Sequence, residues 1–203
     1  QILVNKDLYR EEFYGNRYYS DYYYKNFNII DSKPTKTIPV TSSADLKKIH
    51  LGWNSGLVNW SLLSTLKMSF YSKINSYFKP NNLGTFYSPS KKRLNNLSAR
   101  FNTNYNNQSV SYQRRAVQNL LYRDYKTIKI NRYKYFKELK NSKIVYSPFG
   151  LGEITLKDFE VFLTGGILYK PNMGHMKTWP NFFIENSTYI SHKLNLDDFL
   201  STI

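Results

Sequence analysis

Two glycines and two glutamates lie close together where an apolar run ends. The run at 143–147 is expected to be a strand, it leads into a Pro-Phe-Gly-x-Gly loop, and a helix is expected from about Glu153. Gly150 and Gly152 let a ligand approach the backbone, and the free N–H groups of a helix start favour a phosphate or pyrophosphate. Glu153 and Glu160 are seven residues apart, which places them on nearly the same face of one helix. The alternative is that Glu153 only complements the helix dipole and that Glu160 is an exposed helix residue.

The elements that must position these residues alternate between short apolar runs and amphipathic stretches. We expect strands at 97–102, 127–130, 143–147, 167–169 and 189–190, and helices at 109–121, 133–141 and 153–163, with a last helix beginning at 197. This alternation predicts an α/β fold with an open parallel Rossmann-like sheet and helices on both faces. Ligands of such sheets bind beyond the carboxyl ends of the strands, which is where the glycine loop falls.

Residues 1–80 do not continue this alternation. They hold a Tyr-rich stretch with no long helical or strand period at 1–30, a Pro-containing connection at 31–43 and a helical pattern at 62–77. Pro80, Gly84 and Pro89 mark the best boundary between domains. We therefore expect a partial or atypical N-terminal region at 1–80 and a ligand-binding domain at 90–203.

The segment 143–179 resembles the carboxy-terminal, donor-binding domain of GT-B glycosyltransferases, particularly the exostosin-like and family-4-like enzymes. Those enzymes carry a Ser-Pro-Phe-Gly-x-Gly-Glu segment, then Asp-Phe-Glu, a glycine-containing turn and a Lys-Pro strand. The same elements stand here, in the same order, at 147–153, 158–160, 165–166 and 170–173, followed by Thr-Trp-Pro at 178–180. Several motifs in one order are more specific than any one of them.

The resemblance implies a function and roles for particular residues. It implies transfer of a sugar from a nucleotide-diphosphate sugar to a glycan or other hydroxyl acceptor, without a metal and with no cofactor beyond the donor substrate. Glu153 would lie near the sugar and Glu160 would bind the nucleotide ribose. The family usually has seven residues between these glutamates, whereas six stand between them here. Phe149 would join Gly150 and Gly152 in the donor-binding loop.

Cationic and polar residues near other strand ends complete the expected site. Arg100 is assigned to the diphosphate because its guanidinium fork suits that geometry, although it could instead pair with a surface carboxylate. Asn102 shares its segment, and Lys170 follows another strand, where it would contact phosphate or be a solvated strand end. Trp53 and Asn54, in a Gly-Trp-Asn-Ser-Gly turn, are assigned to the acceptor side of the cleft.

Composition leaves other classes of function open. The net charge of +15 favours an anionic partner, and Tyr and Lys alternate over 122–140, so a basic nucleic-acid-binding protein is the main alternative. A partial transferase that needs further domains or subunits is another. The absence of Cys excludes disulfides and thiolate metal sites, and three His make a histidine metal centre a poor expectation. No apolar run reaches the roughly 20 residues of a membrane span, and a reducing, cytoplasmic location is expected.

Overall fold

The computed structural model describes residues 18–31 and 87–203, apart from 177. Within them lies a sheet of four parallel strands in the order β1-β2-β3-β4. The strands are β1 (Asn95–Ser98), β2 (Ser142–Tyr146), β3 (Ile167–Pro171) and β4 (Tyr189–His192). Leu97 lies opposite Ile144 in the register, and Val145 lies opposite Leu168. The expected open parallel sheet is therefore confirmed.

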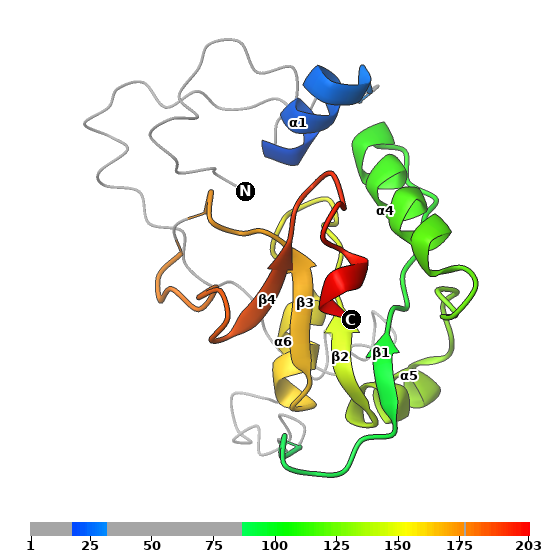
Figure 1. Ribbon diagram of the computed structural model, residues 1–203, viewed down its shortest axis with the longest axis vertical. Coiled ribbons are helices and arrows are strands. Elements are labelled where there is room, and N and C mark those ends of the chain that lie inside the picture. The colour runs from blue at the N-terminus through cyan, green and yellow to red at the C-terminus, as the bar shows by residue number, and fades with distance from the viewer. Residues whose placement is uncertain (1–17, 32–86, 177) are drawn as a thin grey trace, which may run out of the picture.

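The helices frame this sheet, as Figure 1 shows. They are α1 (Tyr18–Phe27), α4 (Gln108–Leu121), α5 (Arg132–Lys140) and α6 (Leu156–Leu163), with a 3-10 turn η2 (Leu200–Thr202) near the end of the chain. Helices α4 and α5 connect β1 to β2, and α6 connects β2 to β3. Among the described residues, no helix is both long and apolar enough to cross a bilayer.

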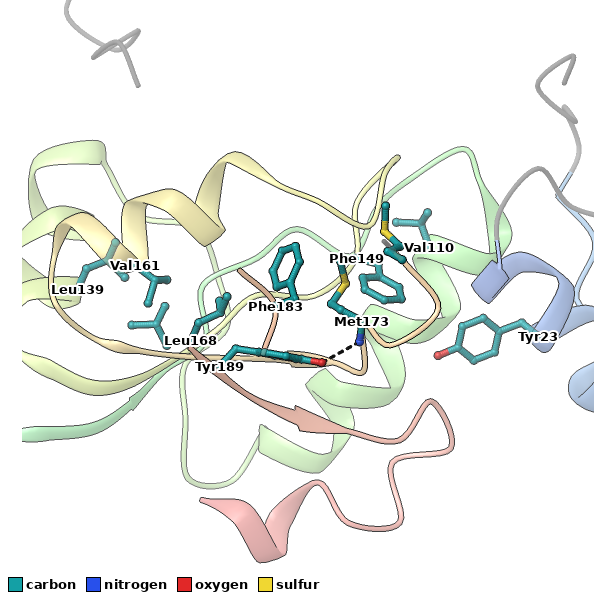
Figure 2. Packing of buried hydrophobic residues seen from close by; sticks show 11 residues of the cluster. Tyr23, Val110, Leu139, Phe149, Val161, Leu168, Met173, Phe183 and Tyr189 are labelled. Carbon is teal, nitrogen blue, oxygen red and sulfur yellow. Dashed lines mark hydrogen bonds between the residues drawn. The ribbon is translucent and has the colours of Figure 1, made fainter. Parts of the chain in front are cut away.

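Side chains that alternate along the strands build one apolar cluster on each face of the sheet. Val145 belongs to the cluster that α5 and α6 cover with Leu139 and Val161. Figure 2 shows this cluster, including Tyr189, whose hydroxyl accepts a hydrogen bond from the Met173 backbone N–H at 3.0 Å. The other cluster contains Leu97, Tyr146 and Tyr169 from the sheet, Val117 and Leu121 from α4, and Phe199. Elements therefore pack on both faces, as expected.

Several sequence expectations need correction. The strand expected at 97–102 is β1 at Asn95–Ser98, and the helix expected from 197 is only the 3-10 turn at Leu200–Thr202. The segment 127–130 is not a strand: the Thr127 carbonyl accepts the Phe101 N–H at 2.9 Å, but no ladder follows. Helix α6 begins at Leu156 rather than at Glu153, because Thr155 takes extended backbone angles as N-cap and forms a capping box with Asp158. Glu153 therefore lies in the loop before the helix, and Glu160 lies within it.

Helix α1 and Asp31, four residues after its end, dock on α4. The side chain of Asn107, the N-cap of α4, makes no capping hydrogen bond, and the first turn of α4 holds no acidic residue. Asp31 supplies what is missing: its carboxylate accepts the backbone N–H of Ser109 at 2.8 Å and the Ser109 hydroxyl at 2.6 Å. A carboxylate at a helix N-terminus satisfies a free N–H and interacts favourably with the dipole. The segment 18–31 thus packs on the domain that the sequence places at 90–203. Residues 80–86 of the expected boundary lie outside the described residues.

Candidate functional site

A buried polar network joins the glycine loop to α6. The Asp158 carboxylate accepts the Ser147 hydroxyl at 2.6 Å, the Thr155 backbone N–H at 3.0 Å and the Thr155 hydroxyl at 3.1 Å. Ser147 follows β2, and its N–H is bonded to the Tyr169 carbonyl at 2.8 Å. Because Asp158 already lies at the start of α6, the protein's own carboxylate occupies part of the position that the sequence assigns to a phosphate.

Lys170 completes that network from β3. Its ammonium lies 2.7 Å from Asp158 Oδ2 and donates to the Glu153 carbonyl at 2.8 Å, with the side chains of Lys170 and Asp158 fully buried. It also lies over the rings of Phe149 and Phe183, at 5.7 and 4.9 Å from their centroids. Burial lowers the pKa of Lys170, although the Asp158 charge opposes the shift. Lys170 therefore ties the glycine loop and α6 to the sheet and is not a solvated strand end.

Arg114 of α4 brings a second cation to the loop. Its Nε donates to the Phe149 carbonyl at 2.9 Å, and Nη1 donates to the Asn102 carbonyl at 2.9 Å. A Cβ built on Gly150 would lie 3.8 Å from Arg114 Nη2, and its nearest neighbour would be Thr155 Cγ2 at 3.6 Å. A side chain at Gly150 would therefore make ordinary van der Waals contacts, one of them with the Arg114 guanidinium.

Lys157 lies in the first turn of α6, and its charge interacts with that of Arg114. Its ammonium donates to the Arg100 carbonyl and lies 5.8 Å from the centre of the Tyr135 ring. Burial and the nearby charge of Arg114 lower the pKa of Lys157 to about 8. The charges of Glu160, Asp158 and Glu138 oppose this shift, so Lys157 lies among carboxylates as well as near a second cation.

Arg100 lies beyond the end of β1 as expected, but its guanidinium is already bound. Nε donates to both carboxylate oxygens of Glu138 at 3.0 Å, and Nη2 donates to Oε2 at 2.8 Å. Nη1 donates to the Ile128 carbonyl at 3.2 Å. This is the pairing with a carboxylate that the sequence left open as the alternative. Arg100 contributes to the site through its backbone carbonyl, which accepts a hydrogen bond from the Lys157 ammonium.

Glu160 is buried and held by α5. Arg132 Nη2 lies 3.0 Å from Oε1, and the Tyr135 hydroxyl donates to Oε2 at 3.1 Å. Burial, with the Glu160 charge next in importance, raises the pKa of Tyr135, so that hydroxyl stays protonated and remains a donor. Glu160 is thus not the exposed helix residue of the alternative interpretation.

Glu153 is fully buried beside Lys170, and its carbonyl is one of the two acceptors of that ammonium. Near it, His175 lies 6.2 Å from the Phe149 ring centre in an edge-on contact. Burial and the Lys170 charge lower the pKa of His175 to about 4, so its imidazole is neutral at pH 7. The structure therefore places Glu153, Phe149, Lys170 and His175 together at the carboxyl end of the sheet.

Of the remaining expected residues, Asn102, Gly150 and Gly152 are described by the structure, and two others are not. Asn102 forms a tight turn, in which its side chain accepts the Asn104 N–H at 3.3 Å and its carbonyl binds Arg114. Gly150 and Gly152 are linked by a backbone hydrogen bond of 3.0 Å within the loop. Trp53 and Asn54 lie outside the described residues.

Sequence reasoning gave no role to Arg114, Lys157 or Asp158. Arg114 had a readable signal, because it follows Val110 by four residues and precedes Val117 by three, which puts it on the buried stripe of α4. Asp158 stands three residues after Thr155, the spacing of a capping box. No local spacing marked Lys157, since its contacts, the Arg100 carbonyl and the Tyr135 ring, come from other elements.

The described part of the chain is an α/β domain with an open, all-parallel sheet, compatible with a Rossmann-like fold. No group of three or more His, Asp or Glu residues in that part is placed to hold a metal ion. No protein-family model, curated protein or solved structure matches the chain. The function is therefore argued from the site itself and from the order of its motifs.

Proposed function

We propose that residues 87–203 form the donor-binding half of a glycosyltransferase active site, with the donor diphosphate at the Gly150–Gly152 loop. The observation that carries the proposal is a pair of neighbouring cations: Arg114, which binds the Phe149 carbonyl next to Gly150, and Lys157 in the first turn of α6. The pair lies at the carboxyl end of β2, which is where parallel sheets bind ligands. The order of motifs over 143–179, which resembles that of GT-B enzymes, supports the same assignment.

The diphosphate would be the leaving group of the reaction. The bond between the sugar anomeric carbon and a diphosphate oxygen breaks, the acceptor oxygen bonds to that carbon, and the acceptor proton passes to a base. Negative charge then grows on the departing oxygen, where fixed cations lower the barrier. Arg114 and Lys157 are the residues that we assign to this task, and Arg100 has a positioning role through its carbonyl contact with Lys157.

The two glutamates differ in how a bound donor could reach them. Glu160 is fixed at the second turn of α6 between Arg132 and Tyr135, one turn from Lys157, so a nucleoside attached to the diphosphate would approach it. Glu153 is enclosed, with no exposed surface. Contact between the Glu153 carboxylate and a sugar therefore requires the loop at 149–154 to move.

Calorimetric titration with a panel of nucleoside diphosphates and their sugars tests the proposal. Loss of one charge-assisted phosphate contact, worth roughly 1.5–3 kcal/mol, predicts that Lys157→Ala weakens binding at least about tenfold. Lys143→Ala is the matched control, because Lys143 is exposed and its side chain donates to Asn96, from the neighbouring strand β1. Gly150→Val should also weaken binding, because its side chain would crowd the Arg114 guanidinium and the loop backbone. Absence of binding to every member of the panel, or equal affinities of Lys157→Ala and wild type, would overturn the proposal.

A further inference from the structure

The end of α4, the connection to α5 and the start of α5 present large apolar side chains to solvent. Ile128 is 75% exposed, Tyr133 81% and Tyr122 66%, and Leu120 is also exposed. We call the region that they define the 120–134 surface. Single exposed apolar residues are common, but several within one short segment point to an interaction site.

The connection that carries Ile128 is anchored by its backbone. The Thr127 carbonyl accepts the Phe101 N–H at 2.9 Å, the Thr127 hydroxyl accepts from Gln118 Nε2 at 2.8 Å, and the Ile128 carbonyl accepts from Arg100. Asn131 then caps α5 by accepting the Lys134 N–H at 2.9 Å. Because these bonds hold the main chain on both sides of Ile128, its exposure is a fixed feature of the fold.

Cations surround these apolar side chains. The exposed cations of the 120–134 surface are Arg123, Lys126, Lys129 and Lys134, and its only acidic residue is Asp124. Apolar side chains beside lysines and arginines are what an anionic bilayer attracts, since the lipid charges draw the cations and the interface takes up the apolar groups.

We infer that the 120–134 surface docks on an anionic lipid membrane. A nucleic acid fits it less well, because single strands bind by stacking bases on open aromatic faces. Ile128 and Leu120 have no such face, and the Arg123 guanidinium lies over the Tyr122 ring at 5.5 Å from its centroid. Tyr133 is the remaining exposed aromatic residue of this surface, which is one ring rather than a series of stacking faces. This inference depends only on the surface and does not require the proposed transferase activity.

Co-sedimentation with vesicles tests the inference on the full chain. Vesicles of phosphatidylcholine mixed with phosphatidylserine should bind the protein, vesicles of phosphatidylcholine alone should bind it much less, and added salt should weaken binding. The Lys126→Gln/Lys129→Gln variant should lose about fivefold in binding for each lysine. Ile128→Ser/Tyr133→Ser should lose at least about tenfold, because two large apolar groups no longer enter the interface.

Matched controls are Lys193→Gln and Ile184→Ser, which remove an exposed cation and a half-exposed isoleucine from other parts of the domain. Both should bind like wild type. Equal binding to the two kinds of vesicle, or equal losses in controls and surface variants, would overturn the inference. Failure to bind vesicles combined with binding to a single-stranded oligothymidine, followed by fluorescence anisotropy, would also overturn it and assign the surface to nucleic acid.

Discussion

At the scale of single residues, both members of the Lys170–Asp158 ion pair are fully enclosed. Asp158 keeps hydrogen bonds from Ser147 and Thr155 even without the lysine, but it would then be a buried carboxylate with no counter-charge. We expect Lys170→Met to lower the free energy of unfolding by about 3–5 kcal/mol, the usual cost of breaking a buried pair from one side. Urea denaturation measures this change.

A second variant separates charge from packing. Lys170→Met/Asp158→Asn should recover part of the loss, because the uncompensated charge is gone while the carbonyl oxygen of the amide still accepts hydrogen bonds. A cost below about 1 kcal/mol for Lys170→Met alone would show that the pair does not hold the loop to the sheet.

The titration of Lys157 belongs to the same scale and bears on the proposed function. Its pKa is lowered to about 8, so the ammonium starts to lose its proton just above neutral pH. A bound diphosphate favours the charged form and raises that pKa. Diphosphate affinity should therefore fall progressively as the pH rises from 7 through 8 and beyond. Calorimetry between pH 7 and pH 9 should show this fall in wild type and none in Lys157→Arg, whose guanidinium stays protonated.

At the scale of elements, the docking of α1 on α4 depends on Asp31. Besides capping Ser109, its Oδ2 accepts the Ser20 hydroxyl of α1 at 3.1 Å, and Tyr23 and Phe27 pack on the Tyr112 ring. Asp31→Ala should cost about 1–2 kcal/mol of stability, as loss of a cap does, and should raise amide exchange in α1. Asp21→Ala is the control: its partner in an i,i+4 ion pair, Lys25, is 52% exposed, and such a pair should be worth less than about 0.5 kcal/mol. Equal effects of the two variants would contradict the capping role.

The sheet could be predicted because its buried positions are also apolar in sequence. Ile144, Val145 and Tyr146 form a continuous apolar run, which is typical of a strand covered on both faces. The start of α6 was misplaced because the glycines before Glu153 suggested a helix start, while the Thr155 and Asp158 spacing marked the true one. Helix α1 was missed because its Tyr-rich sequence has only a weak helical period.

The candidate site could be located but not described in detail. The glycine loop gave its position, since that loop must follow β2 at the carboxyl edge of the sheet. The sequence could not show which arginine lies beside the glycine loop, because Arg100 and Arg114 differ only in their partners. Glu138 of α5 binds Arg100, and the carbonyls of Phe149 and Asn102 bind Arg114. Such pairings join residues far apart in the chain, and local spacing does not encode them.

At the scale of the whole molecule, stability should depend on pH through buried histidines. His192 is 1% exposed among Tyr146, Tyr169 and Phe199, and burial lowers its pKa to about 4. Because the native state resists protonation, the unfolded state binds more protons between pH 6.5 and pH 4. The free energy of unfolding should therefore fall by up to about 3 kcal/mol as the pH is lowered through that window.

His192→Phe should flatten this acid dependence, leaving the part due to His175, whose pKa is also lowered to about 4. The substitution removes the Nδ1 contact with the Lys193 carbonyl but keeps a ring in the aromatic cluster. Within the described residues, His192 Nε2 has no hydrogen-bond partner that the phenyl ring would lose. Denaturation at pH 7 and pH 5 measures the slope, and identical slopes in variant and wild type would contradict the assignment.

The central claim is that a diphosphate binds where Arg114 and Lys157 meet the glycine loop. Amide NMR shifts followed during titration with nucleoside diphosphates test it most directly. We predict the largest shifts at Gly150, Gly152 and Thr155 through Lys157, with little change around Ile128. Shifts centred on the 120–134 surface, or no shifts with any nucleotide, would contradict it.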